Sequence, residues 1–228
     1  MLPMNTLHEN LTVSNMYDLT HTLAAPLLDK HLYPWEVLSE IGAFILELGP
    51  SLPREDYKKL GENVWVSNTA KLYPNHYIEG PAVIGPGTQV RPGAFIRGNA
   101  LVGENCVVGN STELKNVILF DNVQVPHYNY VGDSVLGYKS HMGAGAITSN
   151  VKQDKSIVTV LSNGVKVETN FKKFGAMLGD GVEIGCNSVL NPGTVIGPGA
   201  RVYPLSMVRG FVPARSIYKS RGEIAEIR

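Results

Sequence analysis

Aliphatic side chains recur at every sixth position along much of the chain. Nine successive positions between residues 66 and 114 hold Val, Leu or Ile, and a second series with the same step runs from 178 to 208. Most of these positions are followed four residues later by a small side chain, and Gly, Pro and Asn, which favour turns, lie between them. Each hexad is therefore predicted to form one short strand and one corner. The series are Val66, Leu72, Ile78, Ile84, Val90, Ile96, Val102, Val108 and Leu114, then Leu178, Ile184, Leu190, Ile196, Val202 and Val208.

Three hexads would close one triangular coil, and stacked coils at about 4.8 Å spacing would make a parallel β-helix with the aliphatic side chains inside. The predicted fold class is therefore mainly β, with the β-helix over residues 64–212 and a C-terminal tail over 213–228. The register slips near residues 117–119 and is irregular until the second series begins. Because a repeat has no structural reason to break, we expect function in this irregular stretch.

Two segments do not follow the hexad pattern. Residues 1–63 are predicted to be a short helical cap with a linker over 50–59. Its main helix starts at Pro34, has apolar side chains on one face and stops at Gly49, and a shorter apolar run over 19–28 packs on it. Within an insertion at about 155–173, residues 157–161 and 165–169 flank Asn163-Gly164. This pattern predicts a β-hairpin, expected to protrude as an arm.

Charge and composition narrow the possible partners. Twenty basic and twenty acidic residues give no net charge, so neither nucleic acid nor an anionic membrane surface is an expected partner. Apolar stretches are too short to cross a bilayer and the start lacks the basic residues of a secretory signal, so a cytoplasmic location is expected. Cys106 and Cys186 lie eighty positions apart with no CxxC, which excludes a disulfide framework and favours two small packing residues.

The irregular stretch carries the motifs NSTELKN (110–116), VPHYNYVGD (125–133) and GAGAITSN (143–150), with VRPGA before it and KKFGAMLGD after it. With these motifs the sequence resembles the acetyltransferase half of the bifunctional N-acetylglucosamine-1-phosphate uridylyltransferases. It also resembles archaeal sugar-1-phosphate nucleotidylyltransferases with the same β-helix. The resemblance spans about residues 83–219 and excludes the uridylyltransferase half. It implies a left-handed winding of the β-helix.

The resemblance makes His127 the general base that takes a proton from a sugar amine as the amine attacks the thioester of acetyl-CoA. An imidazole with an ordinary pKa near 6.5 suits that task at neutral pH. The alternative for a single histidine in a repeat is a structural role. Tyr130 matches a tyrosine that helps to hold the sugar phosphate, although packing at a corner is nearly as good an interpretation.

Four further residues correspond to substrate-binding positions in the family. Arg91 and Lys115 match cations that hold the anionic substrate, and their separation of four hexads is expected to let them converge. For either residue alone, a solvated charge at a corner is the better interpretation. Asn150 matches the asparagine of the acceptor site, or is a turn residue. Lys172, or its neighbour Lys173, matches a lysine that reaches across a subunit boundary, or is a solubilising residue at the hairpin base.

Acetyl-CoA is the implied co-substrate, and no metal is required. Ala144, Cys186 and Lys219 are the counterparts of the residues that bind it, with a small core residue as the alternative for Cys186. Three departures weaken the match: His141 stands where the acetyltransferases have asparagine, Cys186 where they often have serine, and Leu205 replaces a corner glycine.

These observations predict an acetyl-CoA-dependent N-acetyltransferase acting on an amino-sugar phosphate related to glucosamine-1-phosphate. The resemblance implies a homotrimer with sites between subunits. The alternative is a catalytically inactive sugar-nucleotide-binding or regulatory trimer, which His141 and Cys186 favour and His127 and Tyr130 oppose. A metal-dependent hydratase would need histidines that this stretch lacks, and Ser140 is not in a nucleophile elbow.

Overall fold

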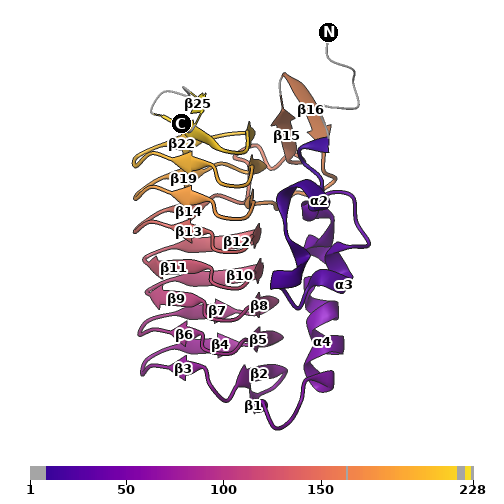
Figure 1. Ribbon diagram of the computed structural model, residues 1–228, viewed down its shortest axis with the longest axis vertical. Coiled ribbons are helices and arrows are strands. Elements are labelled where there is room, and N and C mark those ends of the chain that lie inside the picture. The colour runs from indigo at the N-terminus through magenta and orange to yellow at the C-terminus, as the bar shows by residue number, and fades with distance from the viewer. Residues whose placement is uncertain (1–8, 163, 220–223, 227–228) are drawn as a thin grey trace.

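Parallel strands stack into a three-sided column in the computed structural model, which describes residues 9–162, 164–219 and 224–226 (Figure 1). Most coils place one strand on each of three faces, and each strand pairs in parallel with its counterpart in the next coil. The predicted parallel β-helix is confirmed, and its left-handed winding stays an expectation from the resemblance.

The three faces are defined by their strands. The first face holds β2 (Val64–Ser67), β5 (Ala82–Ile84), β8 (Ala100–Val102), β17 (Ala176–Leu178), β20 (Thr194–Ile196) and β23 (Phe211–Val212). The second holds β3 (Lys71–Leu72), β6 (Gln89–Val90), β9 (Val107–Asn110), β11 (Gln124–His127), β13 (His141–Met142), β18 (Glu183–Ile184), β21 (Arg201–Val202) and β24 (Ser216–Tyr218). The third holds β4 (Tyr77–Glu79), β7 (Phe95–Arg97), β14 (Ile147–Thr148), β19 (Val189–Leu190) and β22 (Met207–Val208). Two longer strands, β10 (Glu113–Leu119) and β12 (Tyr130–Leu136), begin on the third face and continue onto the first.

The hexad aliphatics fill the interior. All members of both series are buried except Leu72 and Ile78, which lie in the first coil and are partly exposed. The register shows why the repeat breaks: Ala82 pairs with Ala100 after 18 residues, but Ala100 pairs with Val117 and Val117 with Ser134 after only 17. The strands β10 and β12 therefore turn the corner without a complete loop, and the site motifs lie in these two coils.

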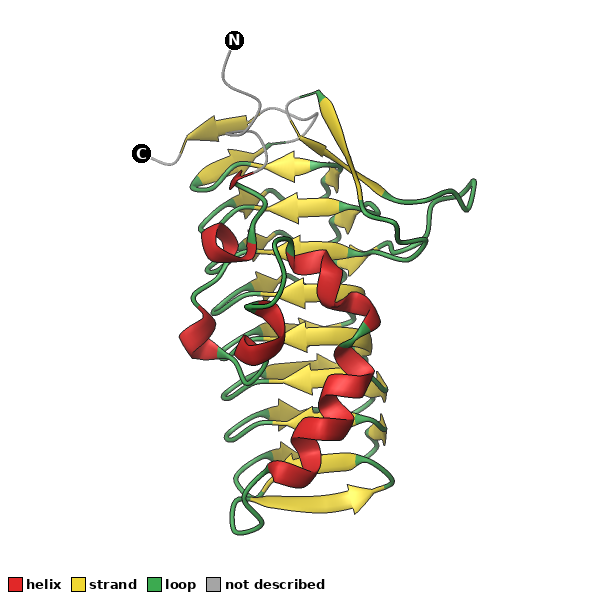
Figure 2. Ribbon diagram, turned by 90° about the vertical axis from the view of Figure 1, so that its right-hand side faces the viewer, coloured by secondary structure: helices red, strands yellow, loops and turns green. Residues whose placement is uncertain are grey.

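The N-terminal helices lie along the first face and do not cap an end of the column (Figure 2). The outward row of this face is apolar and buried, from Trp65 through Leu101 to Val195, because the helices and the hairpin cover it. The elements are α2 (Val13–Met16), η1 (Leu19–His21), α3 (Ala25–Leu28), η2 (Pro34–Ser39) and α4 (Ile41–Ser51). The predicted single helix is thus divided at Glu40, and Gly49 lies inside α4. No helix in the described part of the chain is long and apolar enough to cross a membrane.

The hairpin forms as predicted, with β15 (Thr159–Ser162) antiparallel to β16 (Val165–Glu168); Asn163 itself lies outside the described residues. The hairpin is an inserted arm as expected, and its backbone lies against the column instead of extending away from it. A Cβ on Gly193 would lie 2.7 Å from the Thr159 oxygen, and one on Gly210 would lie 2.5 Å from the Leu161 oxygen. The hairpin backbone therefore packs directly on the last coils, where two glycines make room for it.

Three strands lie outside the expected limits of the β-helix. The strand β1 (Tyr57–Gly61) occupies part of the expected linker and pairs antiparallel with β2. Beyond residue 212, β24 continues the second face, and β25 (Ile224–Glu226) pairs antiparallel with it. The column is therefore longer at both ends than the hexad pattern indicated.

Candidate functional site

The third face is the one on which candidate substrate-binding side chains gather. One outward row runs through Tyr77, Phe95, Glu113, Tyr130 and Ile147, which are consecutive partners in the strand register. These side chains are exposed or half-buried, unlike those of the first face. This row is therefore accessible to a ligand in the single chain.

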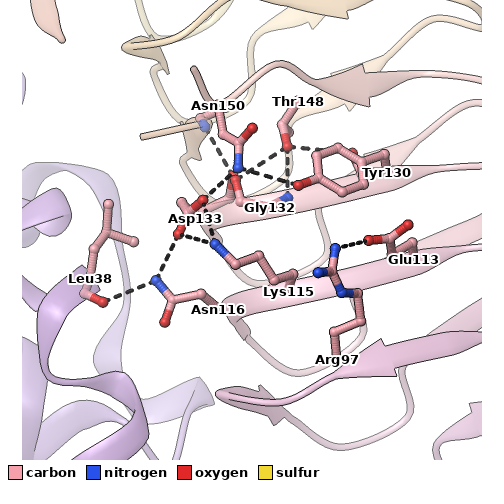
Figure 3. A network of polar contacts seen from close by, with 12 residues as sticks. Leu38, Arg97, Glu113, Lys115, Asn116, Tyr130, Gly132, Asp133, Thr148 and Asn150 are labelled. Atoms are coloured by element: carbon pink, nitrogen blue, oxygen red, sulfur yellow. Dashed lines mark hydrogen bonds and ion pairs between the residues drawn. The ribbon is translucent and has the colours of Figure 1, made fainter. Parts of the chain in front are cut away.

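Asp133 is the centre of a polar network at the edge between the third and first faces (Figure 3). Its carboxylate is nearly buried, and it accepts hydrogen bonds from Lys115 Nζ at 3.2 Å to each oxygen. Asn116 Nδ2 donates to Oδ1 at 3.0 Å, and Asn150 Nδ2 donates to Oδ2. Lys115 and Asn150, two of the predicted substrate-binding residues, are thus brought together by a carboxylate that sequence reasoning did not identify.

Tyr130, the first residue of β12, also belongs to this network. Its hydroxyl accepts a hydrogen bond from Asn150 Nδ2 at 3.2 Å. Burial raises the pKa of Tyr130, and the neighbouring carboxylates of Asp133 and Glu113 raise it further. The phenol therefore keeps its proton at neutral pH and can donate a hydrogen bond to an anionic ligand.

Arg97 is a functional candidate that the sequence interpretation missed. Its guanidinium pairs with Glu113 at 2.7 Å, and it lies on the third face one coil below Lys115 (Figure 3). The pairing raises the pKa of Arg97, mainly through the hydrogen bond to Glu113. The signal was present in the sequence, because one coil is 18 residues and Arg97 precedes Lys115 by that number.

Arg91 does not converge with Lys115. A separation of 24 residues is one coil plus one hexad, so Arg91 follows β6 at the edge of the second face while Lys115 lies on β10. Its guanidinium contacts Gln89 Oε1 at 3.3 and 3.4 Å. The expectation that four hexads return to the same side was therefore wrong, since three hexads make a coil.

His127 lies at the corner between the second and third faces, together with the expected acetyl-CoA residues. The His127 carbonyl accepts the Gly145 amide at 3.0 Å, and the Ala144 carbonyl accepts the Asn187 amide at 2.9 Å. The successive coils thus stack His127, Ala144 and Cys186 in one column, with Lys219 following β24 near its top. The His127 side chain is exposed and has no hydrogen-bond partner among the described residues.

The two cysteines differ in environment. Cys106 is buried, which raises the pKa of its thiol to about 12. Cys186 is exposed at the corner, and the interpretation as a small core residue was wrong for it. A Cβ on Gly143 would lie 3.0 Å from the Cys186 sulfur, so the glycine lets the two corners stack.

Other expected residues have defined positions outside the network. Lys172 is exposed, two residues before Phe174, whose amide donates to the Asn150 carbonyl at 2.9 Å. His141 pairs with Glu183 at 2.8 Å on the second face. Leu205 is 78% exposed. Its backbone is left-handed, with φ of 59°, which is the conformation that a corner glycine adopts without strain. Within residues 9–162, 164–219 and 224–226, no three His, Cys, Asp or Glu side chains gather to hold a metal ion.

The residues of the polar network and His127 lie in a part of the chain that matches a family model. Residues 78–176 match the family model of the GMPPB C-terminal domain. A bifunctional sugar-1-phosphate nucleotidylyltransferase/acetyltransferase of Sulfurisphaera tokodaii is 34% identical over 109 residues, covering 48% of this chain and 27% of that protein. The bifunctional protein GlmU of Methanococcus maripaludis is 36% identical over 194 residues, covering 84% of this chain and 47% of that protein.

The chain spans between about a quarter and a half of these curated relatives. Among solved structures, WeeI from Acinetobacter baumannii AYE is similar with a TM-score of 0.38 and 18% identity, over 81% of this chain and 68% of that one. The expected resemblance to sugar-1-phosphate nucleotidylyltransferase/acetyltransferases is thus confirmed, and residues 78–176 are similar to the GMPPB C-terminal domain.

Proposed function

We propose that the protein is an acetyl-CoA-dependent N-acetyltransferase that acts on an amino-sugar phosphate. The observation that carries the proposal is the third face itself, where Arg97 and Lys115 lie in successive coils beside Tyr130 and Asn150. Two cations and two neutral hydrogen-bonding groups on an open sheet face suit a phosphate joined to a polar ring. The acetyltransferase named among the relatives supports the same reaction class.

In this proposal His127 is the general base. The amine nitrogen of the sugar attacks the thioester carbonyl carbon, so a C–N bond forms and the C–S bond breaks. His127 takes the proton that the nitrogen loses and returns it to the departing thiolate, giving an amide and free coenzyme A. The imidazole is exposed at the corner beside the third face and has no hydrogen-bond partner in the part of the chain that the structure describes, so it is free to do both.

Acetyl-CoA would lie along the corner column, with its thioester near His127. Ala144 and Cys186 lie above His127 in the following coils, and Lys219 supplies a cation for the nucleotide phosphates near the top. The acceptor on the third face and the donor on the corner would then meet at His127.

The assembly we propose is a homotrimer. The first face is already covered by the chain's own helices and hairpin, which leaves the other two faces for subunit contacts. Large apolar side chains are exposed there, including Tyr77, Tyr128 and Met207. A neighbouring subunit would cover His127 and bring its Lys172 to the site. Light scattering coupled to size exclusion tests this, and a fully active monomer would contradict it.

A second candidate function is a sugar-nucleotide-binding or regulatory trimer without catalysis. The observation that favours it is the ion pair of His141 with Glu183, which engages a side chain where the acetyltransferases have asparagine. Binding without turnover is the result that this candidate predicts.

A thiol-release assay with acetyl-CoA and a panel of amino-sugar phosphates tests the enzymatic proposal. We expect release with at least one amine and a loss of 100-fold or more in His127→Ala, since general acid–base catalysis contributes about 10²–10⁴-fold. His76→Ala is the matched control, because His76 is partly exposed in the first coil, far along the sequence from the site motifs. Tight binding of a sugar nucleotide with no thiol release would favour the second candidate.

A further inference from the structure

We propose that Asp133 is a positioning residue that fixes the side-chain amide of Asn150 in one orientation, with its oxygen presented to the acceptor amine. This inference rests on the proposed function and adds a residue to its acceptor site. Asp133 does not itself contact substrate, because its side chain is only 5% exposed and both oxygens are occupied.

The argument begins with what a carboxylate can do. An ionised Asp133 only accepts hydrogen bonds, so Asn150 must turn its NH2 group, and not its oxygen, toward it. The same NH2 group donates its second hydrogen to the Tyr130 hydroxyl at 3.2 Å. Both amide hydrogens are therefore used inside the protein.

The Asn150 oxygen is consequently the group left for a ligand. It has no hydrogen-bond partner in the described part of the chain, and Asn150 is only half-buried. A hydrogen-bond acceptor at this position suits the N–H of an amine. If the amide turned over, it would present a second donor to the amine, and the contact would be lost.

Lys115 is held by the same carboxylate. Its ammonium contacts both Asp133 oxygens at 3.2 Å and remains 26% exposed. An ammonium has three hydrogens, so one remains for an anionic ligand after the carboxylate is satisfied. Asp133 therefore sets the direction of a cation as well as an amide.

The N-terminal helices anchor this arrangement. Asn116 Nδ2 donates to Asp133 Oδ1 and to the Leu38 carbonyl of η2, each at 3.0 Å (Figure 3). Asn116 is buried, and its left-handed backbone, with φ of 55°, directs it between the two acceptors. The helical segment on the first face is thus connected to the acceptor site through one amide.

Asp133→Asn tests the proposal, because an amide of the same shape can donate to Asn150 and lets it turn over. We expect the KM for the acceptor amine to rise about tenfold, while the KM for acetyl-CoA stays within twofold of wild type. Asn116→Ala, which removes only the anchor, should raise the acceptor KM by a smaller factor.

Asp180→Asn is the matched control. Asp180 is also a partly buried carboxylate, but it accepts backbone amides of Asp18 and Tyr138 away from the site. This variant can lower stability without changing the ratio of the two KM values.

A measurement that does not depend on turnover separates this inference from the proposed function. The Asn150 side-chain NH2 signals, assigned in a ¹⁵N spectrum by their loss in Asn150→Ala, should shift in Asp133→Asn and stay in place in Asp180→Asn. If the wild-type protein releases no thiol, the proposed function fails, and the Asn150 signals alone then test the positioning role of Asp133. Unchanged Asn150 signals in folded Asp133→Asn, or an equal rise of both KM values, would overturn the positioning role.

Discussion

The ring of Tyr130 lies across Gly132, two residues later in the same strand. A Cβ built on Gly132 would be 2.5 Å from the Tyr130 hydroxyl oxygen and 2.8 Å from the ring carbon that carries it. Residues two apart in a strand point to the same face, so the missing side chain gives the phenol the space through which it reaches Asn150. The glycine is thus part of the site although it has no functional group.

Gly132→Ala should displace the Tyr130 ring and break its hydrogen bond to Asn150. Because the hydroxyl is the far end of a flexible side chain, we expect little loss of stability but a rise of about fivefold to tenfold in the acceptor KM. Thermal unfolding and the thiol-release assay measure the two effects. Gly61→Ala, which places its Cβ more than 4 Å from any neighbour, is the control and should change neither. An unchanged acceptor KM in Gly132→Ala would argue against a role for Tyr130.

Arg97→Ala and Arg91→Ala separate two assignments of the phosphate-binding cation. Arg97 lies on the third face beside Lys115, whereas Arg91 lies at the edge of the second face. We expect Arg97→Ala to raise the acceptor KM by about tenfold or more, because the variant loses a charge-assisted hydrogen bond to the phosphate. Arg91→Ala should change it by less than twofold. A larger effect of Arg91→Ala would restore the assignment made from the motif VRPGA.

The hexad pattern was sufficient for the architecture because the inward aliphatics form the core directly. It also contained information that was not used. Cys106 follows Val102 by four positions, the inward small slot, and is buried; Cys186 follows Ile184 by two, a corner slot, and is exposed. Counting hexads in threes would likewise have selected Arg97 over Arg91.

Other features were not available from the pattern. Which face the helices cover depends on apolar surfaces that fit each other in the folded chain. Trp65 and Leu101 hold outward positions in their strands, and the hexad pattern places such positions on all three faces alike. Asp133 could not be singled out from the sequence, because Asp is common at turns; its left-handed backbone, with φ of 48°, is shared by many corners of the column. Its importance comes from three donors on other elements that only the folded chain brings together.

Cys106 should make stability fall at alkaline pH. Its pKa is raised from 9.0 to about 12 by burial, so the unfolded chain loses this proton near pH 9 while the folded chain keeps it. The unfolded state is therefore favoured as pH rises from about 9 to 12, with a slope of at most about 1.4 kcal/mol per pH unit. Urea unfolding at pH 8, 9, 10 and 11 measures it. The free energy of unfolding should decline more in wild type than in Cys106→Ala, and parallel declines would contradict the burial of the thiol.

The contact between Gly49 and Trp65 predicts the opposite of the usual effect of alanine in a helix. Gly→Ala inside a helix normally stabilises by about 1 kcal/mol. A Cβ on Gly49, however, would lie 2.3–2.5 Å from three atoms of the Trp65 indole, which is itself largely buried between α4 and the first face. The helix would have to move away from the column, so we expect Gly49→Ala to lower the free energy of unfolding by about 1–3 kcal/mol. Chemical denaturation followed by tryptophan fluorescence measures the change, with Gly61→Ala again as the control. Since the normal propensity and the steric contact act with opposite signs, a stabilised Gly49→Ala variant would show that α4 does not pack on the first face at Trp65.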